Sequence, residues 1–171
     1  MSDYDWSLFD IFLRINAPAK YIFDSWATAR GLVSFFVAKA SFESAQGVVR
    51  GGAEHASVGD RYEWAFIHGP VIEGEMCEMT RDVSLAFTFA SGIVTIKIDP
   101  LPGGSLLNLR QEGIPTTADA MVNEHINCRG AWIHFMTVLK IQLEHGVDGR
   151  DVDPTTAGSL ATRYRPPWSP T

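Results

Sequence analysis

Residues 119–146 read DAMVNEHINCRGAWIHFMTVLKIQLEHG. When successive residues are placed about 100° apart, one side of this stretch forms a stripe about 100° wide that is apolar except for one histidine. The stripe consists of Met121, His125, Cys128, Trp132, Phe135, Met136, Leu139 and Leu143. Gly146 stands where a glycine commonly ends a helix. The stretch therefore predicts one amphipathic helix from about Asp119 to His145, roughly 40 Å long.

Two shorter helices are expected near the N-terminus. Asn16 is a favourable N-cap, and Pro18 is tolerated in a first helical turn. The helix that follows carries Trp26 on its apolar side. Thr28 is expected to cap a second short helix that ends near residues 35–36. This pair of helices interrupts a chain in which apolar and polar residues otherwise alternate, as in β-strands, up to residue 113.

Period-two alternation dominates residues 8–15 and 38–113, and glycine-rich turns divide the second range into hairpin-length pieces. The side chains that share faces are Phe9, Ile11, Leu13 and Ile15; Tyr62, Trp64 and Phe66; Leu85, Phe87 and Phe89; Val94, Ile96 and Ile98; and Leu107, Leu109 and Gln111. Their spacing predicts one antiparallel sheet with a single buried face. The fold class is therefore α+β, with a curved sheet wrapped around the long C-terminal helix.

Composition narrows the class of partner. The chain of 171 residues has 20 acidic and 14 basic residues, with a formal net charge of −6. Nucleic acids and anionic membranes need a clustered basic surface, so we expect no nucleic-acid partner. No apolar stretch of about 18 residues is present, which predicts no membrane insertion. Two cysteines form no disulfide framework and no signal-peptide pattern is visible, so the expected location is the reducing cytoplasm.

Two stretches carry a family resemblance. Residues 15–32 read INAPAKYIFDSWATARGL, and residues 128–150 read CRGAWIHFMTVLKIQLEHGVDGR. These stretches resemble the SRPBCC superfamily of START-like domains, and within it the family named for the C-terminal domain of the activator of heat-shock protein 90 ATPase. The resemblance covers about residues 8–150 and implies the helix-grip fold, also known from birch-pollen allergens. It also implies, for many members, an apolar cavity between sheet and helix.

The resemblance leads us to expect one START-like domain at residues 1–150 and a Pro-rich extension at residues 151–171. We expect ten side chains to line a ligand cavity: Trp26, Phe35, Trp64, Phe66, Phe87, Phe89, Gln111, His125, Trp132 and Met136. Gln111 and His125 are the polar members. The alternative for the apolar members is simple core packing, and for His125 a buried, hydrogen-bonded structural role.

The sequence predicts no metal, no cofactor and no catalytic residue. His125 and His134 are nine residues apart and fall on opposite helix faces, whereas His134 and His145 are separated by about 16 Å along the helix. No serine lies in a G-x-S-x-G turn. Cys128 lies on the core face, where a thiol is normally inert. Glu73, Glu75 and Glu78 are more simply explained as solvated strand residues.

Three functions remain open from the sequence. The first is a domain that binds a small apolar ligand without chemistry of its own. The second is an enzyme of the polyketide cyclase or aromatase kind, which requires an acid or base in the cavity. The third is a protein-interaction or co-chaperone-like module, which requires an exposed apolar patch.

The back of the long helix carries more apolar surface than a solvent-facing side should. His134, Val138 and Ile141 lie opposite or oblique to the core stripe. The segment after Arg150 contains aromatic side chains among prolines. We expect this tail to cover the back of the helix, either on its own subunit or on the mate in a homodimer, with an untethered tail as the alternative.

Overall fold

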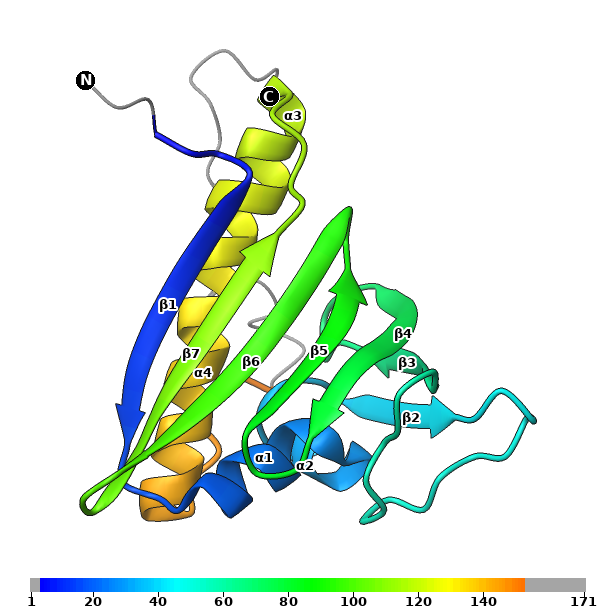
Figure 1. Cartoon of the computed structure of the whole chain (residues 1–171), viewed down its shortest axis with the longest axis vertical. Helices are drawn as coiled ribbons and strands as arrows, with labels where there is room; N and C mark the ends of the chain where they lie inside the picture. Colours follow the sequence, from blue (N-terminus) through cyan, green and yellow to red (C-terminus); the bar gives the residue numbers. More distant parts are fainter. Residues whose placement is uncertain (1–3, 153–171) are drawn as a thin grey trace.

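The computed structural model describes residues 4–152, in which seven antiparallel strands form one sheet in the order β1-β7-β6-β5-β4-β3-β2. Figure 1 shows the sheet curving around the long helix, with β2 and β3 turned across the direction of β1 and with α1 and α2 closing one end. The elements are β1 (Leu8–Ile15), α1 (Ala19–Ala27), α2 (Ala29–Phe35), β2 (Lys39–Glu43), β3 (Arg61–Ala65), β4 (Val71–Thr80), β5 (Ser84–Phe89), β6 (Gly92–Leu101), β7 (Gly104–Glu112), α3 (Ala118–Ala120), η1 (Met121–Asn127) and α4 (Cys128–His145).

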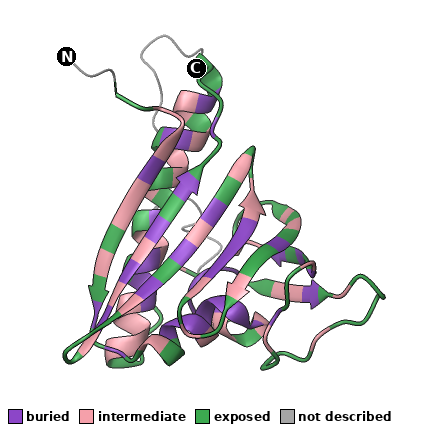
Figure 2. Cartoon of the chain, in the orientation of Figure 1, coloured by how far each residue is buried: buried purple, intermediate pink, exposed green. Residues whose placement is uncertain are grey.

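The predicted alternation of the strands is confirmed. Ile96 pairs with Leu109 across β6 and β7, and Leu109 pairs with Ile11 across β7 and β1. The inward positions of the central strands are buried, whereas Glu73, Glu75 and Glu78 are exposed. Figure 2 shows how buried and exposed residues alternate along these strands. One buried face is thus formed from strands that are distant in sequence, as the α+β prediction requires.

The N-terminal helices form where the sequence predicts, with one correction at the first cap. Pro18 rather than Asn16 is the N-cap of α1, and it makes no side-chain cap hydrogen bond. The amide of Asn16 instead donates to Glu144 Oε1 at 2.7 Å, which ties the end of β1 to α4. Thr28 caps α2 as predicted, because its Oγ1 accepts a 3.0 Å hydrogen bond from the amide of Gly31.

The long helix is continuous in sequence but not uniform. Residues 121–127 form a π-helical segment between α3 and α4, where the prediction assumed regular α-helical spacing. A π-helix accommodates more residues per turn than an α-helix, so the stripe shifts around the helix axis. His125, Trp132, Met136 and Leu139 are buried as predicted, while the other four stripe residues are only partly buried. Gly146 ends the helix with φ of 69°, in the left-handed region.

The back of α4 is covered in part by the segment that follows the helix. Val138 is only 2% exposed. A methyl group on Gly149 would lie 3.8 Å from both Val138 Cγ2 and Ile141 Cδ1. Arg150 then donates to the carbonyl oxygens of Val33 in α2 and of Val37 just after it, at 2.7 and 2.9 Å. The chain therefore folds back over α4 before residue 151, and the expected contribution of residues 153–171 lies outside the described residues.

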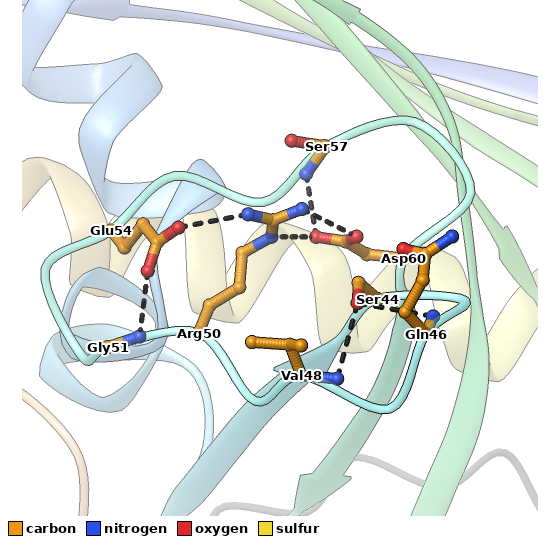
Figure 3. Close-up of polar contacts among 8 residues, drawn as sticks. All are labelled: Ser44, Gln46, Val48, Arg50, Gly51, Glu54, Ser57 and Asp60. Carbon is orange, nitrogen blue, oxygen red and sulfur yellow. Dashed lines mark hydrogen bonds and ion pairs between the residues drawn. The ribbon is translucent and has the colours of Figure 1, made fainter.

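The long connection between β2 and β3 is held by a partly buried ion pair (Figure 3). The Arg50 guanidinium donates to both carboxylate oxygens of Asp60, with the Nη2–Oδ1 bond at 2.9 Å. Arg50 also reaches Glu54 at 2.9 Å, and Asp60 accepts from the amide of Ser57 at 2.8 Å. These donors hold the pKa of Asp60 below its ordinary value. The connection is therefore an ordered part of the fold.

Candidate functional site

An aromatic cluster lies between the sheet and α4. Trp26, Trp64 and Trp132 are each at most 2% exposed. The ring of Phe87 on β5 lies 5.1 Å from that of Trp64 and 6.4 Å from that of Trp132, centroid to centroid. The structure thus brings together residues from α1, β3, β5 and α4 that the sequence assigned to a cavity lining.

Phe36, which the sequence did not select, connects this cluster. It is 2% exposed and its ring is stacked on Trp132 at 5.2 Å. It also contacts the rings of Trp26 and Trp64, at 6.1 and 5.6 Å. The signal that could have found Phe36 is its place directly after the second short helix, beside the selected Phe35.

Three aromatic side chains at the edge of the cluster are only partly buried: Phe66, Phe89 and Phe135. The Phe66 and Phe135 rings lie 6.0 Å apart, and Phe89 is 4.9 Å from Trp132. Phe35 and Met136, also predicted cavity residues, are fully enclosed. The cluster therefore approaches the surface where the chain after β3, the end of β5 and the middle of α4 meet.

Three nitrogen atoms in the cluster have no hydrogen-bond partner among the described residues, although they are buried: Trp26 Nε1, Trp64 Nε1 and Gln111 Nε2. Gln111 is fully buried at the end of β7, and its Oε1 accepts a 2.9 Å hydrogen bond from Trp132 Nε1. The amide oxygen of Gln111 is thus satisfied and its amide nitrogen is not. Hydrogen-bond donors remain available in an otherwise apolar interior.

His125 has a different environment from the other nine predicted residues. Its Nδ1 lies 2.9 Å from the carbonyl oxygen of Trp6, and its Nε2 lies 2.7 Å from the hydroxyl of Tyr4. Because a carbonyl only accepts, neutral His125 carries its proton on Nδ1, and Tyr4 donates to Nε2. Burial lowers the pKa of His125, which favours this neutral form.

A surface groove of about 450 Å³ adjoins His125. Its walls are Tyr4, Trp6, His125, Ile126, Arg129, Gly130 and Ile133. His125 is the only residue shared with the ten predicted cavity residues. No periodic pattern pointed to Tyr4 and Trp6, because they precede the first strand.

Reactive side chains are few in the part of the chain that is described. Residues 4–152 contain no group of three or more His, Cys, Asp or Glu side chains placed to hold a metal ion. Burial raises the pKa of Cys128 to about 11, and its Sγ donates to the carbonyl oxygen of Asn123. Cys77 is exposed on β4. Within the same range, no helix is both long enough and apolar enough to cross a membrane.

The curved seven-stranded sheet, the two short helices after β1 and the long C-terminal helix define the helix-grip fold. No family model matches the sequence, and no curated protein matches it at a significant level. The fold is therefore established by solved structures rather than by related sequences.

Several solved structures share this fold. The Aha1 dimer from Colwellia psychrerythraea, solved in solution, is 16% identical with a TM-score of 0.65; the match covers 81% of this chain and 97% of that chain. DynU16, a putative protein in the dynemicin biosynthetic locus, is 13% identical with a TM-score of 0.67, over 85% of this chain and 50% of that chain. A Chromobacterium violaceum protein is 21% identical with a TM-score of 0.59, over 81% of this chain and 97% of that chain.

Proposed function

We propose that the protein is a START-like domain of the family named for the activator of heat-shock protein 90 ATPase, and that it binds a small apolar ligand between the sheet and α4. The observation that carries this proposal is the set of unpaired buried donors, Trp26 Nε1, Trp64 Nε1 and Gln111 Nε2. The likeness of fold to the Aha1 dimer and to DynU16 supports the family assignment.

The unpaired donors favour one kind of ligand. A buried N–H group without a partner costs about 1–3 kcal/mol, and an acceptor brought by a ligand would remove that cost. All three groups are nitrogen donors, and the surrounding rings are apolar. The complementary molecule is therefore an apolar frame that carries ketone, quinone or ether oxygens. Buried water is the competing acceptor, and such a ligand would replace it.

The same groups favour binding over catalysis. Indole and amide N–H groups do not exchange protons with a substrate near neutral pH, so they can orient an oxygen but cannot act as general acid or base. Tyr62, the titratable side chain stacked on Trp64 at 3.8 Å, has its pKa raised by burial and donates to the carbonyl oxygen of Thr88. A cyclase reaction would need a different proton donor.

A ligand can reach the buried donors only if the side chains at the edge of the aromatic cluster move. Phe66, Phe89 and Phe135 are partly exposed and pack on Trp132 or Phe36. Rotation of these rings would open a path to the donors without separating the strands.

The test is a pair of probes that differ in one oxygen. Benzophenone carries a carbonyl acceptor on an apolar frame, and diphenylmethane has the same frame without it. We expect benzophenone to bind with saturation in calorimetry, and at least about tenfold more tightly than diphenylmethane. Trp64→Phe should reduce the difference between the two probes, and Trp6→Phe, outside the cluster, should not. Equal affinity for both probes, or no binding of either, would overturn the proposal.

A further inference from the structure

The groove beside His125 has features of a second binding site, independent of the aromatic interior. One wall is the N-terminal segment, whose Tyr4 and Trp6 rings meet edge to face at 4.8 Å. The other wall is the outward side of η1 and α4, where Ile126 and Ile133 remain 36% and 47% exposed. Gly130 lies between the two isoleucines and adds no side chain, which leaves the groove open.

The aromatic wall is held in place by its own hydrogen bonds. His125 fixes Tyr4 through its hydroxyl and Trp6 through its carbonyl oxygen. The carbonyl oxygen of Ser7 accepts from the amide of Ile114 at 3.0 Å, which anchors the segment to the chain after β7. The Trp6 ring also lies 5.1 Å from the His125 ring, edge to face. A ligand would therefore meet a preformed surface and lose little affinity to ordering it.

Arg129 supplies a positive charge at this groove. Its side chain is exposed, and it makes no ion pair or hydrogen bond with any residue between 4 and 152. The nearby carboxylate of Asp5 is engaged elsewhere, because its Oδ1 accepts from both the amide and the hydroxyl of Ser7. The charge of Arg129 is felt at His125, where it helps to lower the pKa.

We propose that this groove binds a small planar aromatic carboxylate, with the ring between Trp6 and Ile133 and the carboxylate on Arg129. Aromatic and aliphatic walls favour a flat apolar body. A guanidinium favours a carboxylate because it can donate two parallel hydrogen bonds to it. The ligand differs in class from the neutral, acceptor-bearing molecule of the interior, so the two sites are distinguishable by charge.

The experiment titrates the full chain with 2-naphthoate and, separately, with the uncharged 2-naphthamide. Calorimetry gives the affinities, and the indole N–H resonances of the five tryptophans report the location. We expect naphthoate to bind about tenfold more tightly than naphthamide and to shift the Trp6 resonance. Arg129→Gln should abolish the preference for naphthoate over naphthamide. In the unaltered protein, about 0.5 M salt should weaken the same preference.

Arg81→Gln is the matched control, because Arg81 is an exposed arginine on the turn after β4. The Arg81→Gln variant should keep the affinities of the unaltered protein for both naphthoate and naphthamide. Equal binding of naphthoate and naphthamide, or an Arg129→Gln protein that keeps the preference, overturns the proposal. Shifts at Trp26, Trp64 and Trp132 without one at Trp6 also overturn it, because they place the probe in the interior.

Discussion

Trp132 Nε1 donates a 2.9 Å hydrogen bond to Gln111 Oε1, and this bond joins the middle of α4 to the end of β7 inside the core. Both side chains are at most 2% exposed. The bond fixes the rotational position of α4 against the sheet, because Trp132 can reach Gln111 from only one side of the helix. It also leaves Gln111 Nε2 as a free donor. The same pair thus contributes to stability and to the proposed ligand site.

Trp132→Ala should lower the free energy of unfolding by about 3–5 kcal/mol, since it removes a large buried ring. Trp132→Phe should cost about 1–3 kcal/mol, because it keeps a ring but leaves the Gln111 amide without a partner. Ile133→Ala is the adjacent control, since Ile133 is 47% exposed, and it should change stability little. Chemical denaturation measures all three. A midpoint for Trp132→Ala equal to that of the unaltered protein would refute this placement of the helix face.

Gly31→Ala should destabilise the protein although it lies in a helix, where alanine is normally favoured. A β-carbon at this position would lie 2.4 Å from the carbonyl oxygen of Asp24 and 2.5 Å from Ser25 Cα, so α1 and α2 would have to separate. Gly52→Ala is the control, because no atom lies within 4 Å of its added carbon. Thermal melting should show a clear decrease for the first variant and little change for the second. The opposite order would contradict the close packing of the two helices.

His125 should make stability depend on pH in the window that begins at about 6.5 and extends to lower pH. Its pKa in the folded protein is lowered from 6.5, mainly by burial, so the unfolded chain binds the proton more tightly. The stabilisation that neutral His125 contributes is therefore fully present above the pKa of His125 in the unfolded chain. It is lost as the pH falls below that pKa. Denaturation midpoints measured at several pH values test this. His125→Gln should remove the dependence in this window, and an unchanged profile in that variant would assign the dependence to another group.

The two cysteines should differ in reactivity towards a thiol reagent. Cys77 is exposed, whereas burial raises the pKa of Cys128 to about 11 and removes its thiolate at neutral pH. Mass spectrometry of digested protein should find the label on Cys77 first and on Cys128 only after unfolding. Cys77→Ser should then be almost unlabelled in the native state. Equal rates at the two positions would contradict the lower exposure of Cys128, which is partly buried.

The fold was predictable because its signals are local and periodic. The stripe that contains Trp132 and Met136 and the alternation through Phe87 follow from spacing alone. The π-helical segment before Cys128 was not predictable, because the spacing argument assumes one α-helical period along the whole stretch. Pro18 rather than Asn16 is the cap because α1 begins only at Ala19, and the Asn16 amide binds Glu144, a partner 128 residues away.

The candidate site was predictable in residue type but not in organisation. Aromatic side chains on strand and helix faces pointed to Trp26, Trp64 and Phe89. Which of their polar atoms find partners depends on the packed structure, so the unpaired donors could not be foreseen. The groove is lined by Tyr4 and Trp6 on one side and Arg129 on the other, and these two parts of the chain are far apart in sequence and share no pattern.

The most direct test of the proposed interior site follows the tryptophan indole N–H resonances while benzophenone is added. If the carbonyl reaches the unpaired donors, the Trp26 and Trp64 resonances should move downfield with saturation, because their N–H groups gain an acceptor. Trp132 should move less, because its N–H is already bonded to Gln111, and Trp6 should not move. A saturating shift at Trp6 alone, or no shift at Trp26 and Trp64, would contradict binding in the aromatic interior.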